Sequence, residues 1–267
     1  MNTNGSGAPL IEVKHVKKYF PIRRGLLQRE VARVHAVDDV SFAVREGETL
    51  GLVGESGCGK STLGRTIVRL LEPTAGQILF EGQSIEKLGA RRLRPLRRQM
   101  QMVFQDPYAS LNPRKRVGQI IGDPLKIHGI GDERERKAQV EQLPETVGLS
   151  PEHYHRSPPA LSGGHRHRSG RRAGHPPRPK LVVADEPVSA LDVSIQSQML
   201  NLLEDHQNEN KLTYNFIHHD LWVVLHVSDR IAVLYTGKIM DVYPAVDSHQ
   251  RRTAPHSETY VPAVHDP

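Results

Sequence analysis

Residues 48–65, ETLGLVGESGCGKSTLGR, decide the fold of this chain of 267 residues. A short apolar run enters a glycine-rich turn, and a stretch with leucine and isoleucine at helical spacing follows it. The turn, GESGCGKS at residues 54–61, matches the phosphate-binding loop pattern and stands between a predicted strand and a predicted helix. Glycines let successive backbone N–H groups point at phosphate oxygens, and the start of the helix adds its positive dipole. The segment therefore predicts a nucleotide phosphate site in an α/β fold.

The loop residues have separate expected roles. Lys60 is expected to reach the β- and γ-phosphates, and the Ser61 hydroxyl to bind Mg²⁺, with Thr62 behind it. Cys58 occupies a variable position of the pattern and needs no redox role. A glycine-rich turn without a ligand is the alternative, which this context disfavours. The residues expected to bind the nucleotide here are Gly54, Glu55, Ser56, Gly57, Cys58, Gly59, Lys60, Ser61 and Thr62.

A second element, LVVADE at residues 181–186, is an apolar strand that ends in two acids. At the carboxyl edge of a parallel sheet, Asp185 is expected near the Mg²⁺ and the phosphate loop. Glu186 can accept a proton from the attacking water or orient it. Such a run usually marks only a strand end, but in a chain with this loop it predicts a nucleotide-hydrolysing site.

The rest of the chain alternates strand and helix patterns. Residues 10–44 predict antiparallel strands, with residues 21–34 as an insertion or a long hairpin. The helix after the phosphate loop is expected to stop at Pro73 and Gly76, and QILFEG to form a strand. Residues 87–157 are charged and mostly helical in pattern, whereas YNFIHHD reads as a buried strand and DRIAVLYTGKIMDV as a hairpin turning at Thr236. This order predicts a mainly parallel sheet with helices on both faces.

Composition bounds the function classes. The net charge is +6, and arginines cluster at residues 91–98 and 166–178, with no interleaved aromatic residues to stack on bases. We interpret the arginine clusters first as a solvated face, and second as a surface that attracts anionic lipid heads. Nucleic acid is not expected as a partner. No run approaches the roughly 20 apolar residues of a membrane-spanning helix. The leader MNTNGSGAPL lacks a signal pattern, and the single cysteine fits a reducing cytosol.

Four further motifs narrow the choice: LSGG at residues 161–164, Gln105 in VFQDP, SALD at residues 189–192, and His219 in FIHHDL. With the loop and the two acids, they resemble the nucleotide-binding domain of ABC transporters over residues 10–240. The resemblance implies a P-loop NTPase core with an antiparallel β subdomain and an inserted helical subdomain at about residues 87–165. Residues 1–9 are then a flexible leader and residues 241–267 a tail, a truncated form of the family's extension.

The resemblance also implies roles for single residues. Gln105 would sense the Mg²⁺ and the attacking water, and His219 would hold the γ-phosphate during hydrolysis. Phe20, with Tyr19 as the alternative, would stack on adenine. The signature motif would contact ATP held by the opposite subunit, and the dimer-facing residues are Ser162, Gly163, Gly164 and Asp192.

Longer segments resemble one branch of the family, the dipeptide/oligopeptide (or nickel) importers. They are RRGLLQ, VHAVDDVSF, GLVGESGCGKSTLGR, MVFQDPYASLNPR, PLKIHG and ADEPVSALDVSIQSQ. The resemblance implies an ATPase at the cytoplasmic face of the membrane that uses ATP and Mg²⁺. Its partners would be an identical or paralogous ATP-binding subunit, two transmembrane permease subunits and, indirectly, an extracytoplasmic solute-binding protein. The resemblance does not name the cargo.

Residues 165–179, HRHRSGRRAGHPPRP, depart from the family pattern. Pro176 and Pro177 each cost roughly 3 kcal/mol in a helix interior. One hypothesis is that residues 169–178 are read out of frame between two compensating indels, which resequencing the DNA would test. ATP binding is expected to survive and cooperative hydrolysis to weaken. A catalytically impaired ATP-binding partner is therefore the alternative function, and a soluble ABC ATPase of DNA repair or translation is a weaker one.

Overall fold

The computed structural model describes residues 8–25, 28–105, 112, 115–138, 179–189 and 192–245. They fall into two compact units, one made of Met1–Lys87 with Thr213–Pro267 and the other of Leu88–Leu212. The predicted inserted lobe at about residues 87–165 and the predicted domain ends at residues 10 and 240 stay predictions. No helix in the described ranges is long and apolar enough to cross a membrane.

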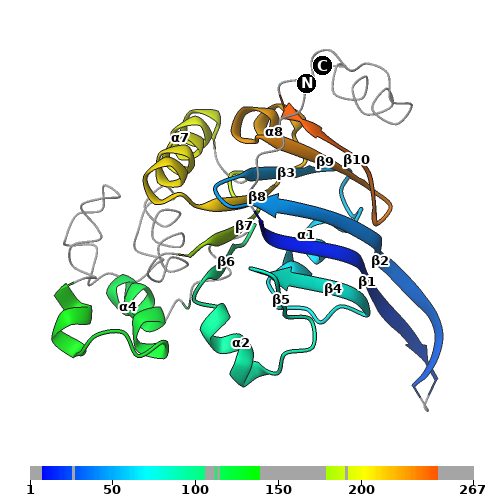
Figure 1. The fold of residues 1–267 in the computed structure, drawn as a ribbon, viewed down its shortest axis with the longest axis horizontal. Helices are drawn as coiled ribbons and strands as arrows, with labels where there is room; N and C mark the ends of the chain where they lie inside the picture. Colours follow the sequence, from blue (N-terminus) through cyan, green and yellow to red (C-terminus); the bar gives the residue numbers. More distant parts are fainter. Residues whose placement is uncertain are drawn as a thin grey trace. The chain divides into compact units, whose positions relative to one another are not determined.

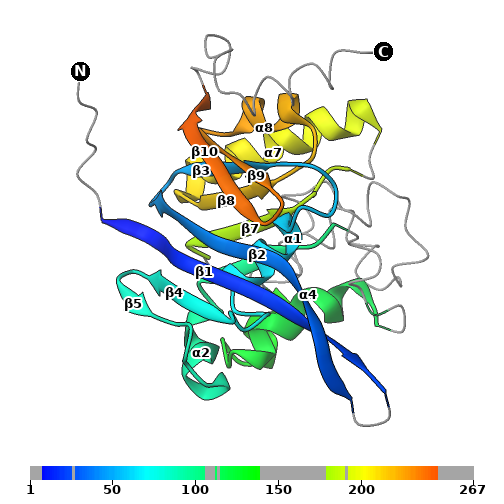
Figure 2. The same cartoon turned by 90° about the vertical axis from the view of Figure 1, so that its right-hand side faces the viewer.

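The first unit contains an antiparallel sheet in the order β2-β1-β4-β5. Its strands are β1 (Pro9–Arg24), β2 (Arg29–Arg45), β4 (Ala75–Phe80) and β5 (Gln83–Ser84). Strands β1 and β2 pair from Pro9↔Arg45 to Arg24↔Arg29, and Figure 2 shows them as two long neighbouring strands in dark and lighter blue. The predicted antiparallel strands are confirmed, and residues 21–24 pair with residues 29–33 as a continuation of the same two strands.

The same unit contains further strands in the order β10-β9-β3-β8, in which β3 and β8 are fully buried, β9 is mostly buried, and β10 is exposed or half-buried. They are β3 (Thr49–Val53), β8 (Thr213–Ile217), β9 (Arg230–Tyr235) and β10 (Lys238–Pro244). Strand β3 pairs in parallel with both β8 and β9, which places the strand before the phosphate loop between two neighbours. The predicted hairpin is confirmed, with φ of 43° at Thr236 and 80° at Gly237.

Helix α1 (Lys60–Ile67) ends earlier than predicted. The expectation that it runs to Pro73 is wrong, because Arg69 adopts φ of 56° and ends the helix. Arg69 N–H donates to Thr66 O at 3.1 Å and Leu70 N–H to Arg65 O at 2.9 Å, the two bonds of a Schellman motif. The Arg69 side chain is buried, and its Nε donates to Ile85 O at 3.0 Å. This contact holds a non-glycine residue in a position that usually favours glycine.

Helix α8 (Leu221–Val227) is an element that the sequence patterns did not predict. The carboxylate of Asp220 caps it by accepting the Trp222 N–H at 2.8 Å. Helix α8 lies against β3 (Figure 1), where a Cβ added to Gly51 would come within 2.2 Å of Val224 Cγ1. The glycine therefore allows the close approach of helix and strand.

The second unit contains β6 (Met100–Val103) in parallel with β7 (Leu181–Asp185). Figure 1 labels the helices α2 (Ala90–Leu96), α4 (Val117–Ile127) and α7 (Val193–Asn210) in this unit. Strand β6 lies in a segment expected to be helical. It forms a strand because it pairs with β7, and just before it Gln99 O accepts the N–H groups of Lys180 and Leu181. The predicted strand β7 and helix α7 are confirmed. Parallel pairing in both units confirms the α/β fold class.

Candidate functional site

The phosphate loop wraps around the ammonium of Lys60. This side chain is 5% exposed, and Nζ donates to Gly54 O at 2.6 Å and Glu55 O at 2.8 Å. An ammonium carries three hydrogens, and two carbonyl oxygens of the loop accept hydrogen bonds from it. These bonds hold the buried cation against the loop backbone. Burial of the neighbouring Cys58 thiol raises its pKa, with the nearby Lys60 opposing the shift. A raised pKa keeps a thiol neutral, and the neutral thiol is a weaker nucleophile than the thiolate.

Two glycines of the loop are required by their surroundings. A Cβ on Gly54 would lie 2.2 Å from Leu234 O, and one on Gly59 would lie 2.0 Å from Ala36 O. Gly59 also has φ of 108°, and it precedes the first residue of α1 without a side-chain cap. No acidic side chain lies in the first turn of α1, whose described N-terminus thus keeps its positive dipole for an anion. These features fit the predicted phosphate loop, and its ligand stays a prediction.

Two histidines follow strand β8. His218 is 2% exposed, and its Nδ1 accepts the Asp220 N–H at 3.0 Å, which places the ring proton on Nε2. The His219 ring stacks on His218, with centroids 4.6 Å apart and 15° between planes, and is exposed. His219, the residue expected to hold the γ-phosphate, is thus exposed to solvent and packs against the buried ring of His218. Sequence reasoning did not single out His218, and the adjacent histidines were the available signal.

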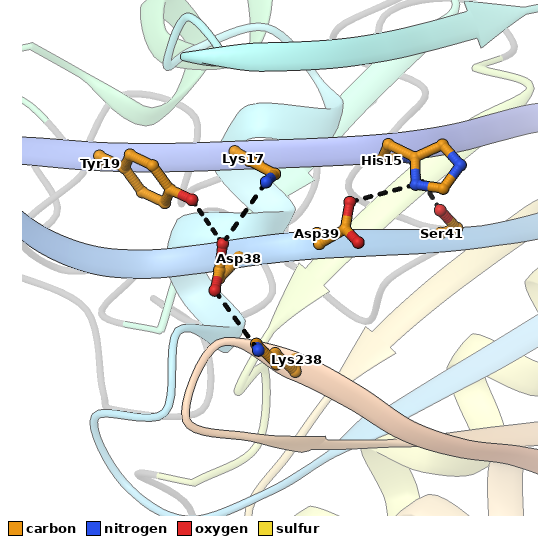
Figure 3. A network of polar contacts seen from close by, with 7 residues as sticks. All are labelled: His15, Lys17, Tyr19, Asp38, Asp39, Ser41 and Lys238. Carbon is orange, nitrogen blue, oxygen red and sulfur yellow. Dashed lines mark hydrogen bonds and ion pairs between the residues drawn. The ribbon is translucent and has the colours of Figure 1, made fainter.

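Two neighbouring aromatic residues of β1, Tyr19 and Phe20, differ in their surroundings. The Tyr19 ring stacks on the His35 ring, with centroids 4.0 Å apart. Its hydroxyl donates to Asp38 (Figure 3). Phe20 is 37% exposed, and Lys18 Nζ lies 4.9 Å from its ring centroid. Since the Tyr19 ring and hydroxyl are engaged within the sheet, the geometry favours Phe20 over Tyr19 as the residue for base stacking.

In the second unit, strand β7 brings the two acids into position. Asp185 is fully buried at the end of β7, and Glu186 follows with φ of 47°. The side chain of Gln105 donates from Nε2 to Glu186 Oε2 at 3.1 Å. These two predicted catalytic residues are 81 positions apart, and they meet because β6 and β7 are parallel neighbours. Within the described ranges, no cluster of three or more His, Cys, Asp or Glu could hold a metal ion.

The remaining predicted residues are divided between the described and the undescribed parts of the chain. Asp192 is exposed and precedes α7 as its N-cap. Ser189 donates its hydroxyl to Glu186 O at 3.1 Å. The signature residues Ser162, Gly163 and Gly164, and the hypothesis about residues 169–178, lie outside the described residues.

Comparison with known proteins agrees with these motifs. The sequence model described as ABC transporter matches residues 37–189. The oligopeptide transport ATP-binding protein AppF of Bacillus subtilis is 52% identical over 256 residues, covering 96% of this chain and 78% of that protein. The oligopeptide transport ATP-binding protein OppF of Bacillus subtilis is 48% identical over 257 residues, covering 96% and 82%.

A solved dimeric ATP-binding cassette, in a post-hydrolysis state bound to ADP and Pi, has a similar fold. The TM-score is 0.76 at 24% identity, and the alignment covers 88% of this chain and 98% of that one. The predicted fold and family are confirmed, and with them the prediction of an ATPase. The chain therefore belongs to the ABC transporter family, in the branch that includes the oligopeptide transport ATP-binding proteins, as an ATP-hydrolysing subunit.

Proposed function

We propose that this chain powers the import of di- or oligopeptides and works as a peripheral protein on the cytoplasmic face of the membrane. The observation that carries the proposal is the 52% identity, over 96% of the chain, to an oligopeptide transport ATP-binding protein. ATP and Mg²⁺ are the proposed ligands. Two transmembrane permease subunits and a second ATP-binding subunit, identical or paralogous, are the proposed partners, with an extracytoplasmic solute-binding protein that delivers cargo.

Nucleotide binding is assigned to the phosphate loop and to Phe20. Lys60 supplies a buried positive charge for the β- and γ-phosphates, and the backbone N–H groups of the loop supply donors. Phe20 offers an exposed ring face to adenine. In this arrangement, contacts at both ends of the nucleotide add to its affinity.

The Mg²⁺ is assigned to the hydroxyl of Ser61 and the carboxylate of Asp185, with Gln105 as a further oxygen ligand. Hydroxyl and carboxylate oxygens are hard ligands that suit Mg²⁺, which takes one or two protein ligands and fills its shell with phosphate and water oxygens. A site of this kind does not need a cluster of several acids. When bound, the ion neutralises charge on the phosphoryl oxygens.

Hydrolysis is assigned to Glu186, Gln105 and His219. The Glu186 carboxylate accepts a hydrogen bond from Gln105 at 3.1 Å, which orients it for general-base work on water. His219 presents an exposed imidazole on the fixed ring of His218, ready to donate to a γ-phosphate oxygen. Catalysis in this class is mostly positioning and charge neutralisation, which rigid contacts of this kind serve.

The proposed working unit is a dimer in which two ATP molecules lie between two subunits. Each ATP would touch the phosphate loop of one subunit and the signature residues Ser162, Gly163 and Gly164 of the other. Asp192 is exposed, as a residue at the dimer interface must be in a single subunit. Closure of the dimer would move the permease helices through the surface near Gln105.

Replacement of Glu186 by Gln tests this function in the transporter reconstituted with its permeases. General acid–base groups contribute about 10²–10⁴-fold, so we expect ATP turnover and peptide uptake to fall by about that factor while ATP binding is kept. Glu204→Gln, on the exposed side of α7, is the matched control and should leave turnover unchanged. Uptake of nickel in place of peptides would contradict the proposed cargo.

The same variant separates the alternative, a catalytically impaired subunit that binds ATP while its partner hydrolyses it. In that case Glu186→Gln would leave turnover unchanged. The identity to known transport ATP-binding proteins does not favour this alternative.

A second variant, with an apolar helix restored at residues 169–178, should hydrolyse faster than the chain as written if that segment weakens cooperativity.

A further inference from the structure

Strand β1 is clamped on both sides immediately before Phe20. On one side Tyr19 N–H donates to Thr74 Oγ1 at 2.9 Å, and Thr74 N–H donates to Lys17 O at 2.7 Å. On the other side the Tyr19 ring stacks on His35 of β2. The Tyr19 hydroxyl donates to Asp38, also on β2 (Figure 3). The backbone position of Phe20 is therefore set by the anchoring of Tyr19.

The Asp38 carboxylate is the centre of this cluster. Besides the Tyr19 hydroxyl, it faces Lys17 Nζ at 4.0 Å from β1 and Lys238 Nζ at 3.6 Å from β10 (Figure 3). The hydrogen bond from Tyr19 is the main cause that lowers the pKa of Asp38; burial opposes it and the two lysines add to it. One carboxylate thus joins three strands of the first unit.

The backbone of Asp38 continues this connection to the phosphate loop. Asp38 N–H donates to Gly237 O at 2.7 Å, and Gly237 N–H donates to Cys58 O at 2.9 Å. The next loop residue, Gly59, packs against Ala36 O so closely that a Cβ would lie 2.0 Å away. The loop is therefore supported by the β2 segment and the β9–β10 turn that Asp38 holds.

We propose that Asp38 is a positioning residue that sets the place of Phe20 relative to the phosphate loop, so that a nucleoside triphosphate engages both at once. Its side chain fixes the strand that carries Phe20, and its backbone fixes the turn that supports Cys58. The proposal rests on the proposed function, in which Phe20 stacks on the base. Preorganised contacts at both ends raise affinity because less ordering is needed on binding.

A purely structural role for Asp38 predicts a different result. If Asp38 only stabilised the β1–β2 hairpin, its loss would weaken every ligand of the phosphate loop to the same degree. If it positions Phe20, its loss should weaken ligands that carry a base and spare those that do not. Inorganic triphosphate, which has the phosphates of ATP and no base, is therefore the probe that separates the two roles.

The experiment is a double-mutant cycle between Asp38→Ala and Phe20→Ala in the full chain, with affinities for Mg·ATP and Mg·triphosphate measured by calorimetry. Base stacking is worth about tenfold in affinity. We expect each single variant to bind ATP about tenfold more weakly, with less than about a twofold change for triphosphate, and the double variant to add little. Equal losses for both ligands, or additive losses for ATP, would overturn the proposal.

Asp39→Asn is the matched control. Asp39 neighbours Asp38, has φ of 62° that asparagine tolerates, and contacts His15 at 3.1 Å (Figure 3). The Asp39→Asn variant should bind both ligands like the wild type. A loss of ATP affinity as large as that of Asp38→Ala would overturn the assignment of Asp38. Tyr19→Phe and Asp38→Asn keep the test available if Asp38→Ala does not fold. A wild type that binds no ATP would instead refute the proposed function.

Discussion

At the scale of single residues, the phosphate loop shows two separate requirements for glycine. Gly57 has φ of 81° and open space around it, so only its backbone conformation favours glycine. Gly59 has φ of 108° and in addition faces a carbonyl oxygen of β2, which leaves no room for a methyl group. The second requirement comes from a strand more than 20 residues earlier and is invisible in the loop itself.

Gly59→Ala should therefore be much more harmful than an alanine at a glycine where only φ matters. We expect it to lower the free energy of unfolding by about 3 kcal/mol or more, or to shift the loop and weaken ATP binding over tenfold. Gly82→Ala, at φ of 75° with nothing within 4 Å, is the control and should cost about 1 kcal/mol. Urea denaturation and ATP titration measure both, and similar effects of the two variants would contradict the steric argument.

At the scale of elements, helix α1 is short because a tertiary contact ends it. The Schellman bonds close the helix after Ile67, and the guanidinium of Arg69 reaches Ile85 O. Leucines at helical spacing continue past this point, but Leu70 is 49% exposed. Packing of one buried arginine therefore outweighs the apolar periodicity.

Two substitutions of Arg69 separate the guanidinium contact from the backbone conformation. Both Arg69→Ala and Arg69→Gly remove the donor to Ile85 O and should be less stable than the wild type. At φ of 56°, however, glycine is unstrained and alanine is not. We expect Arg69→Gly to be more stable than Arg69→Ala by about 1 kcal/mol in chemical denaturation. Equal stability would mean that the helix end rearranges.

The β1–β2 hairpin should show a pH dependence through Tyr19 and Asp38. The hydrogen bond lowers the pKa of Asp38, so its contribution to stability is present above about pH 4 and is lost as pH falls through the lowered pKa. The same bond raises the pKa of Tyr19, so its contribution is present below about pH 10 and is lost as pH rises through the raised pKa.

The stability difference between wild type and Tyr19→Phe should therefore be constant from about pH 5 to 9 and shrink outside that window. Unfolding free energies from urea titrations at a series of pH values measure this difference. A difference that stays unchanged at about pH 3 would show that the hydroxyl bond does not depend on the Asp38 charge.

At the scale of the whole molecule, ligand binding should raise the stability of the folded chain. A ligand that binds only the folded chain stabilises it by about 2.7 kcal/mol at 100 times its Kd. We expect Mg·ATP to raise Tm, and removal of Mg²⁺ with EDTA to reduce the rise. Lys60→Ala should abolish most of the shift relative to its own Tm, because the buried ammonium at the phosphates is lost. An undiminished shift in that variant would contradict the assignment of the loop.

Local patterns in the sequence were enough for the phosphate loop, the buried strands β3, β7 and β8, and the hairpin turn at Thr236. Each of these depends on the conformation of a few neighbouring residues or on continuous burial, which short-range patterns record. The resemblance to ABC transporters supplied the roles of Gln105 and His219, and the comparisons confirmed the family. The residue roles themselves stay predictions.

Tertiary structure decided the contacts between distant segments. The meeting of Gln105 with Glu186 depends on which strand lies beside β7, and the end of α1 depends on a carbonyl after β5. The connection from Tyr19 through Asp38 to Cys58 depends on the order of β1, β2 and the β9–β10 turn. Sequence periodicity shows which face of an element is buried, but not which partner covers it, because that choice is made by packing of the whole sheet.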